Sequence, residues 1–141
     1  MLSALYAELA RARRARFSRP GRRRRLRHPV VSVGNLSVGG RGKTPAVAHV
    51  VEVLKTLGER PAVLTRGYKR RVPQEGVVVV HDGRAIRADV DRAGDEPLML
   101  ARALETTPVL VCPDRYLAGR LAEVHFRTTV HVLDDGFQHL A

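Results

Sequence analysis

The sequence contains few of the residues that stabilise disulfide-rich domains or stack on nucleic-acid bases. It has one cysteine, no tryptophan, three tyrosines and three phenylalanines in 141 residues. Since Cys112 has no second cysteine to pair with, an intrachain disulfide framework is excluded, and we expect a reducing compartment. Because aromatic residues make up only 4% of the chain, little is available to stack on exposed bases, and no nucleic-acid partner is expected.

Long hydrophobic runs and metal-ligand patterns are also missing. No stretch approaches the ~18 consecutive apolar residues of a transmembrane helix, and the N-terminus lacks an uninterrupted hydrophobic segment with a cleavage site. The six histidines show neither the H-E-x-x-H spacing nor a Cys/His ligand spacing, so a zinc site of those types is excluded. Because the sequence shows neither a transmembrane run nor a signal segment, we expect a protein that stays on the cytoplasmic side.

Positive charge is abundant but unevenly distributed. The net charge is +11, yet residues 1–27 hold ten arginines and a single acid, Glu8, which gives +9 for that segment. The remainder holds 15 basic and 13 acidic residues, which gives +2. The basic character therefore belongs to an N-terminal arm, for which we predict a boundary near residue 28.

The first part of this arm has the pattern of a basic amphipathic helix. Leu2, Leu5 and Leu9 recur at helical spacing, and arginines occupy many of the other positions. Such a helix can lie in the interface of an anionic membrane, with its arginines on the headgroups. A charged helix packed on its own domain is the alternative, and nucleic-acid binding is the least favoured reading.

From His28 onward, short β-branched runs alternate with helical patterns. Continuous apolar strands separated by amphipathic helices indicate an α/β fold with a mainly parallel sheet and helices on both faces. We predict that residues 28–141 form one P-loop NTPase-like domain. The turn-rich stretch from Tyr68 to Ala93 is expected to be a surface excursion or a hairpin.

Residues 35–45, NLSVGGRGKTP, end like the phosphate-binding pattern G-x-x-x-x-G-K-[ST], although Ser37 stands where the first glycine is usual. The strand pattern PVVSV precedes this loop and a helical pattern follows it. A glycine-rich turn can present its N–H groups to phosphates, and the helix N-terminus adds partial positive charge. We predict an ATP-binding loop rather than a coincidental glycine-rich turn. Its predicted nucleotide-binding residues are Gly39, Gly40, Arg41, Gly42, Lys43 and Thr44.

A P-loop needs a further acid for its Mg²⁺, normally at the end of a neighbouring strand. The stretch TTVHVLDD has strand character and ends in Asp134 and Asp135. The carboxyl edge of a parallel sheet would place these acids beside the loop. The alternative is a pair of acids that merely begins the turn before Gly136.

Polar residues at other predicted strand and helix ends are further candidates. Asp95 and Glu96 open a helix, either as compensation for its dipole or as carboxylates directed at the active crevice. Arg66 ends a strand before Gly67 turns the chain, and Arg115 begins a helix just after a strand. Each arginine can face the phosphates or be an ordinary surface residue.

Taken together, SVGNLSVGGRGKTP, LTRGY, GDEPLMLA, VCPDR and VLDDGFQH resemble, in this order and spacing, the tetraacyldisaccharide 4'-kinases, the lipid A 4'-kinases. The resemblance covers residues 28–140. That family has threonine or serine where the common loop has its first glycine, so Ser37 supports the resemblance. It implies transfer of the ATP γ-phosphate to the 4'-hydroxyl of a tetraacylated disaccharide 1-phosphate, giving lipid IVA, at the cytoplasmic face of the inner membrane.

The resemblance also implies roles for individual residues. Lys43 and Thr44 match the phosphate and magnesium residues, and Asp95 matches an aspartate thought to activate the sugar hydroxyl as a general base. Glu96, Arg66 and Arg115 are weaker matches. The implied catalytic residues are Asp95, Lys43 and Asp135, and the implied Mg²⁺ ligands are Thr44, Asp134, Asp135 and Glu96.

Members of that family are considerably longer than this chain and have a second lobe that supplies more of the sugar site. We therefore expect the nucleotide-binding part of a kinase, inactive on its own. Two alternatives remain at this point: a P-loop ATPase that drives partner assembly, and a truncated non-catalytic protein that binds nucleotide.

Overall fold

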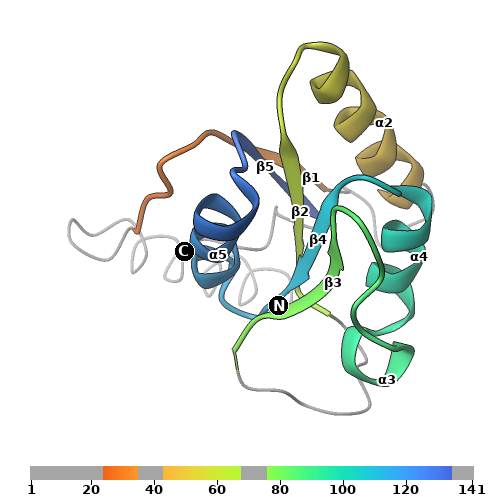
Figure 1. Ribbon diagram of the computed structural model, residues 1–141. Coiled ribbons are helices and arrows are strands. Elements are labelled where there is room, and N and C mark those ends of the chain that lie inside the picture. The colour runs from red at the N-terminus through yellow and green to blue at the C-terminus, as the bar shows by residue number, and fades with distance from the viewer. Residues whose placement is uncertain (1–23, 35–42, 68–75, 135–141) are drawn as a thin grey trace, which may run out of the picture.

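A computed structural model describes residues 24–34, 43–67 and 76–134, in which strands and helices mostly alternate along the chain (Figure 1). The sequence patterns predict this alternation. The elements are β1 (Val30–Val33), α2 (Lys43–Thr56), β2 (Pro61–Thr65), β3 (Val78–Asp82), α3 (Val90–Ala93), α4 (Asp95–Ala103), β4 (Pro108–Val111), α5 (Arg115–Phe126) and β5 (Val130–Asp134).

In the described residues, the strands form one five-stranded sheet in the order β1-β5-β2-β4-β3. The pairs β1–β5, β5–β2 and β2–β4 are parallel, and β3 is antiparallel to β4. The prediction of a mainly parallel sheet is therefore confirmed. Since β1 and β5 are far apart in sequence but adjacent in the sheet, the end of β5 lies directly beside the strand that leads into the predicted phosphate loop.

The central strands are mostly apolar because both faces of the sheet are covered. All five residues of β2 are buried, and alternate side chains enter different cores. Val63 packs with residues of α2, α3 and α4, whereas Ala62 and Leu64 pack with residues of α5. Figure 1 shows α2 and α4 on one side of the sheet and α5 on the other, which confirms the predicted helices on both faces. Each fully buried valine or leucine stabilises the fold by roughly 1.5–3 kcal/mol.

The segment directly before β1 is packed against α5. Leu26 belongs to the core on the α5 side and lies over Gly119, where a Cβ atom would overlap the leucine side chain. Arg24 Nη2 donates to Asp114 Oδ2 at 2.6 Å, and the N–H of Arg27 donates to Glu123 Oε1 at 2.7 Å. Residues 24–27 are thus fastened to the folded body, although the pattern of charge assigns them to the arm.

The predicted excursion from Tyr68 to Ala93 contains the edge strand β3. A hairpin-like turn follows β3, because Asp82 Oδ1 accepts the N–H groups of Arg84 and Ala85, and His81 pairs with Ile86. Gly83 has a φ of 90° in this turn, a conformation that glycine adopts without strain. Part of this stretch is therefore integral to the sheet.

Several predictions concern residues outside the described part of the chain. These are the amphipathic helix within residues 1–23, the glycines and Arg41 of the loop in residues 35–42, and Asp135 in residues 135–141. The domain boundary near residue 28 stays a prediction.

Candidate functional site

The carboxyl ends of four parallel strands, β1, β5, β2 and β4, lie at one edge of the sheet. Helices α2 and α5 each follow one of these strands, and α4 leads back to the start of β4. The amino ends of these helices therefore lie at this same edge. Open parallel sheets bind their ligands at such an edge.

The helix α2 begins with the two residues that the loop motif predicts as phosphate and magnesium ligands. Lys43 and Thr44 are its first residues, and both are partly buried. The first turn of α2 contains no acidic residue, so no carboxylate of that turn compensates the positive end of the helix dipole. Lys43 adds further positive charge at this end. This arrangement favours an anion at the helix start. Pro45 fits in this first turn because the missing N–H has no helical partner there.

A buried carboxylate lies at the end of the adjacent strand. Asp134 is the last residue of β5, is 2% exposed, and is in register with Val33, the last residue of β1. The neighbouring strand on the other side is β2, where Leu64 pairs with Leu133. The sequence predicts an acid at the end of a neighbouring strand, and the structure places Asp134 between the carboxyl ends of β1 and β2.

Asp95 and Glu96 form the start of α4, and both are exposed. The N-cap position is occupied by Gly94, with a φ of 89° and no side chain to cap the helix. The two carboxylates therefore lie one and two positions inside the helix, where they compensate its dipole. Their exposure also leaves them accessible from the carboxyl edge of the sheet.

The two candidate arginines have different surroundings. Arg66 follows β2 and is exposed, and Gly67 has a φ of 71°, a conformation that glycine adopts without strain. Arg115 is 5% exposed, and its Nη1 donates to the carbonyl oxygens of Cys112 and Pro113 at 3.3 and 3.0 Å. The alternative that Arg115 is an ordinary surface arginine is wrong, because its guanidinium group holds the loop between β4 and α5.

The sequence patterns did not reveal a polar cluster centred on Glu123. Its Oε1 accepts the N–H groups of Arg27 and His28 and lies 3.3 Å from His131 Nε2, and its Oε2 contacts Arg120 Nη1 at 2.9 Å. Burial raises the pKa of the Glu123 carboxyl, but these hydrogen bonds outweigh it and hold the pKa below its ordinary value. No local pattern could predict this cluster, since Arg27 and His28 lie 96 and 95 residues before Glu123.

The predicted magnesium ligands have suitable chemistry for that ion. Mg²⁺ prefers hard oxygen donors, and Thr44 and Asp134 offer a hydroxyl and a carboxylate on adjacent elements. Among the described residues, no three His, Cys, Asp or Glu side chains are grouped so that they could hold a metal ion. None of the helices in the described segments is both long enough and apolar enough to span a bilayer.

Comparison with known protein families gives one match over the whole chain. The sequence model of the family described as "Tetraacyldisaccharide-1-P 4'-kinase" matches residues 1–141. The tetraacyldisaccharide 4'-kinase of Pelobacter propionicus is 44% identical over 140 residues, which are 98% of this chain and 38% of that relative. The enzyme of the same name from Geobacter metallireducens is 47% identical over 118 residues, which are 83% of this chain and 34% of that relative.

One solved structure has a fold similar to that of this chain. The crystal structure of LpxK from Aquifex aeolicus in complex with ATP matches with a TM-score of 0.85 and 38% identity, over 98% of this chain and 43% of that chain. The chain thus spans less than half the length of the relatives that it matches.

Proposed function

Because this chain belongs to the tetraacyldisaccharide-1-P 4'-kinase family, we propose that it is the ATP-binding part of a lipid kinase. The reaction would transfer the γ-phosphate of ATP to the 4'-hydroxyl of tetraacyldisaccharide 1-phosphate in lipid A biosynthesis, giving lipid IVA. One observation carries the proposal: 98% of this chain matches an ATP-bound relative in fold, at 38% identity.

ATP would bind at the carboxyl edge of the sheet. The amides of Gly39, Gly40, Arg41 and Gly42 would surround the phosphates, and Lys43 would contact the β- and γ-phosphates at the start of α2. Thr44 and the acids Asp134 and Asp135 would hold Mg²⁺, with Glu96 as a further candidate. The ion would neutralise charge that develops on the phosphate oxygens.

Asp95 is the proposed general base for the sugar hydroxyl. Its exposed position at the start of α4 lets an acceptor approach the carboxylate from the carboxyl edge. Arg66, also exposed at that edge, would contact a phosphate directly. Arg115 would act through the backbone that it holds at Cys112 and Pro113, so we assign it a positioning role.

Residues 1–27 would attach the protein to an anionic membrane surface, which is where a tetraacylated substrate resides. Their ten arginines suit a peripheral association with the cytoplasmic face of the inner membrane.

A chimera tests the function directly. Residues 1–141 would replace the matching segment of the Pelobacter propionicus kinase, and transfer of labelled γ-phosphate to tetraacyldisaccharide 1-phosphate would be measured. We expect lipid phosphorylation by the chimera and its loss on Lys43→Ala. Asp95→Asn should bind ATP normally but transfer phosphate at least about 100-fold more slowly, the usual contribution of a general base.

The distribution of label separates the alternatives. Label found only in free phosphate would favour an ATPase, and ATP binding with neither product would favour a non-catalytic nucleotide-binding protein. Unchanged ATP affinity and transfer in Lys43→Ala would remove the assigned role of the loop.

A further inference from the structure

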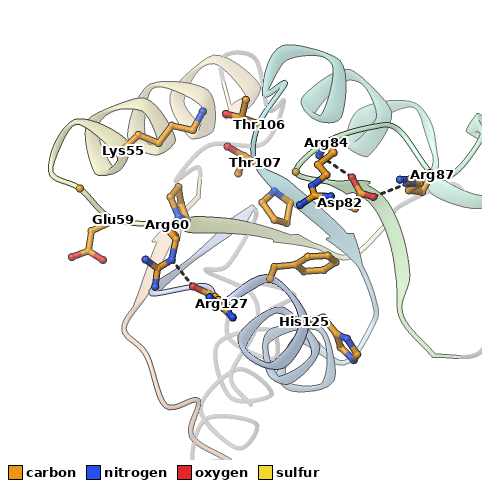
Figure 2. Close-up of a pocket in the computed structure, with 15 residues that line it drawn as sticks. Lys55, Glu59, Arg60, Asp82, Arg84, Arg87, Thr106, Thr107, His125 and Arg127 are labelled. Carbon is orange, nitrogen blue, oxygen red and sulfur yellow. Dashed lines mark hydrogen bonds and ion pairs between the residues drawn. The ribbon is translucent and has the colours of Figure 1, made fainter.

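A groove lies at the opposite edge of the sheet, where the parallel strands begin (Figure 2). Its volume is about 850 Å³, and it is bounded by the end of α2, the start of β2, the turn after β3, the start of β4 and the end of α5. Because the predicted ATP loop lies at the carboxyl edge, this groove is separate from the proposed catalytic site.

The lining of the groove is strongly cationic. Five permanently positive side chains face two carboxylates, which gives a charge of +3 when the histidine is counted as neutral. The ionisable lining residues are Lys55, Arg60, Arg84, Arg87, Arg127, His125, Glu59 and Asp82.

Some of these charges are already paired. Arg87 Nε bonds Asp82 Oδ2 at 2.6 Å, and Lys55 Nζ bonds Glu52 Oε1 at 2.9 Å. The N–H of Ala85 and the Arg87 guanidinium hold the pKa of Asp82 well below its usual range, so Asp82 stays ionised and paired with Arg87. In contrast, Arg84 and Arg127 are exposed, and within the described segments their guanidinium groups have no hydrogen-bond or ion-pair partner.

The carbonyl ends of α2 and α5 oppose an anion here, because each helix C-terminus carries roughly half a negative charge. The two ends together remove about one charge, and Glu52 neutralises Lys55, so the net charge falls from +3 to about +1 and the groove remains positive. Lys55 in the last turn of α2 and Arg127 at the C-cap of α5 are also placed to interact with these ends. Arg84 lies in the turn after β3, apart from both helix ends, and the half charge at the end of α5 offsets only part of the charge of Arg127.

Two threonines belong to this lining. Thr106 is exposed in the groove, and Thr107 is only 1% exposed. Among the described residues, the Oγ1 atom of Thr107 has no hydrogen-bond partner. Figure 2 shows both threonines between Lys55 and the Arg84–Asp82–Arg87 cluster. Guanidinium groups and hydroxyls together are the donors that recognise phosphate oxygens.

We propose that this groove is a second anion site, which binds a phosphate-bearing ligand of at least two negative charges through Arg84 and Arg127. The phosphate could belong to a soluble compound or to a lipid headgroup, since the recognising chemistry is the same. This site goes beyond the proposed kinase function and does not depend on it.

The test uses the full 141-residue chain carrying Lys43→Ala, so that the predicted ATP loop does not compete for the probe. Inorganic pyrophosphate would be titrated calorimetrically at low ionic strength. We expect binding that weakens with salt, and about tenfold or greater loss of affinity in the double variant Arg84→Gln, Arg127→Gln, since two charge-assisted contacts disappear. Arg102→Gln is the matched control, because Arg102 is an exposed arginine of α4 outside the groove.

A second arm measures sedimentation with phosphatidic acid vesicles, because the phosphomonoester headgroup carries up to two negative charges. A decrease caused by the double variant with vesicles would assign the site to headgroups, and a decrease with pyrophosphate alone would assign it to a soluble ligand. The proposal is overturned if the double variant binds both probes as the Lys43→Ala parent does, or if Arg102→Gln weakens binding equally. Unchanged thermal unfolding of each variant would establish that the fold is intact.

Discussion

At the scale of single residues, the stability of the fold depends on the protonation state of His131, which is buried beside Glu123. His131 is fully buried in β5, and its surroundings contain Glu123, whose other oxygen contacts Arg120, together with His28. Burial lowers the pKa of His131, and the hydrogen bond to Glu123 opposes that shift only in part. The folded protein therefore keeps this imidazole neutral at pH values at which an unfolded chain would protonate it.

This arrangement predicts a loss of stability on acidification. In the folded protein the pKa of His131 lies below its ordinary value of 6.5. The neutral imidazole therefore makes its full contribution to the free energy of unfolding above that pH. This contribution is lost as the pH falls below 6.5, since the unfolded state takes up the proton first. For one proton, the free energy of unfolding changes by at most about 1.4 kcal/mol per pH unit. Urea unfolding between pH 7.5 and 5 should show this decline, and His131→Gln should show a flatter one.

Exposed His49 of α2 supplies the control for this prediction. His49→Gln should keep the pH dependence of the parent. Equal slopes for the parent and His131→Gln would mean that other groups cause the decline. Below pH 4.5, the ordinary pKa of Glu123, protonation of that carboxyl should remove further stability in every variant whose Glu123 is intact.

At the scale of an element, α5 depends on the residue that precedes it. Asp114 Oδ1 accepts the N–H groups of Tyr116 and Leu117, and its Oδ2 pairs with Arg24, which also lies over the Tyr116 ring at 4.8 Å. One carboxylate thus caps the helix and fastens the segment before β1.

Substitution can separate the two roles of Asp114. Asp114→Ala should lower the free energy of unfolding by about 1–2 kcal/mol, because both the cap and the partly exposed ion pair disappear. Asp114→Asn should lose less than about 1 kcal/mol, since asparagine also caps helices. Chemical denaturation at pH 7 measures both values. An alanine variant as stable as the asparagine variant would show that the cap contributes nothing.

At the scale of the whole molecule, the point where the arm joins the body lies on α5. Residues 24–28 contribute Leu26 to the core and two backbone N–H groups to Glu123. A deletion that ends at residue 23 and one that ends at residue 27 should therefore behave differently.

Removal of residues 1–23 eliminates seven arginines and should weaken binding to anionic vesicles in a salt-dependent manner, with the fold retained. Removal of residues 1–27 should also lower stability by about 2 kcal/mol or more, through the loss of Leu26 and the bonds to Asp114 and Glu123. Vesicle sedimentation and thermal unfolding distinguish the two effects. Equal vesicle binding by the complete chain and the shorter deletion would remove the membrane role from the arm.

The sequence predicts most of the sheet because its signals are local. Apolar runs such as PAVLT become strands buried on both faces, and GKT marks the start of α2. Arg66 and Arg115 have similar local contexts, each at a strand or helix end, yet one is exposed and the other is buried against backbone carbonyls. Local pattern cannot distinguish them, since burial depends on which segments pack nearby.

The sequence by itself determined the fold class, most of the strands and helices, and the motifs that mark the chain as a member of this kinase family. Only the tertiary structure decided that Asp134 lies beside the end of β1, that Glu123 holds residues 27 and 28, and that arginines from separate turns line one groove. The physical reason is the range of the interactions. Hydrophobic period and turn chemistry act over a few neighbouring residues, whereas ion pairs, buried hydrogen bonds and clustered charge require residues distant in sequence to meet in the folded chain.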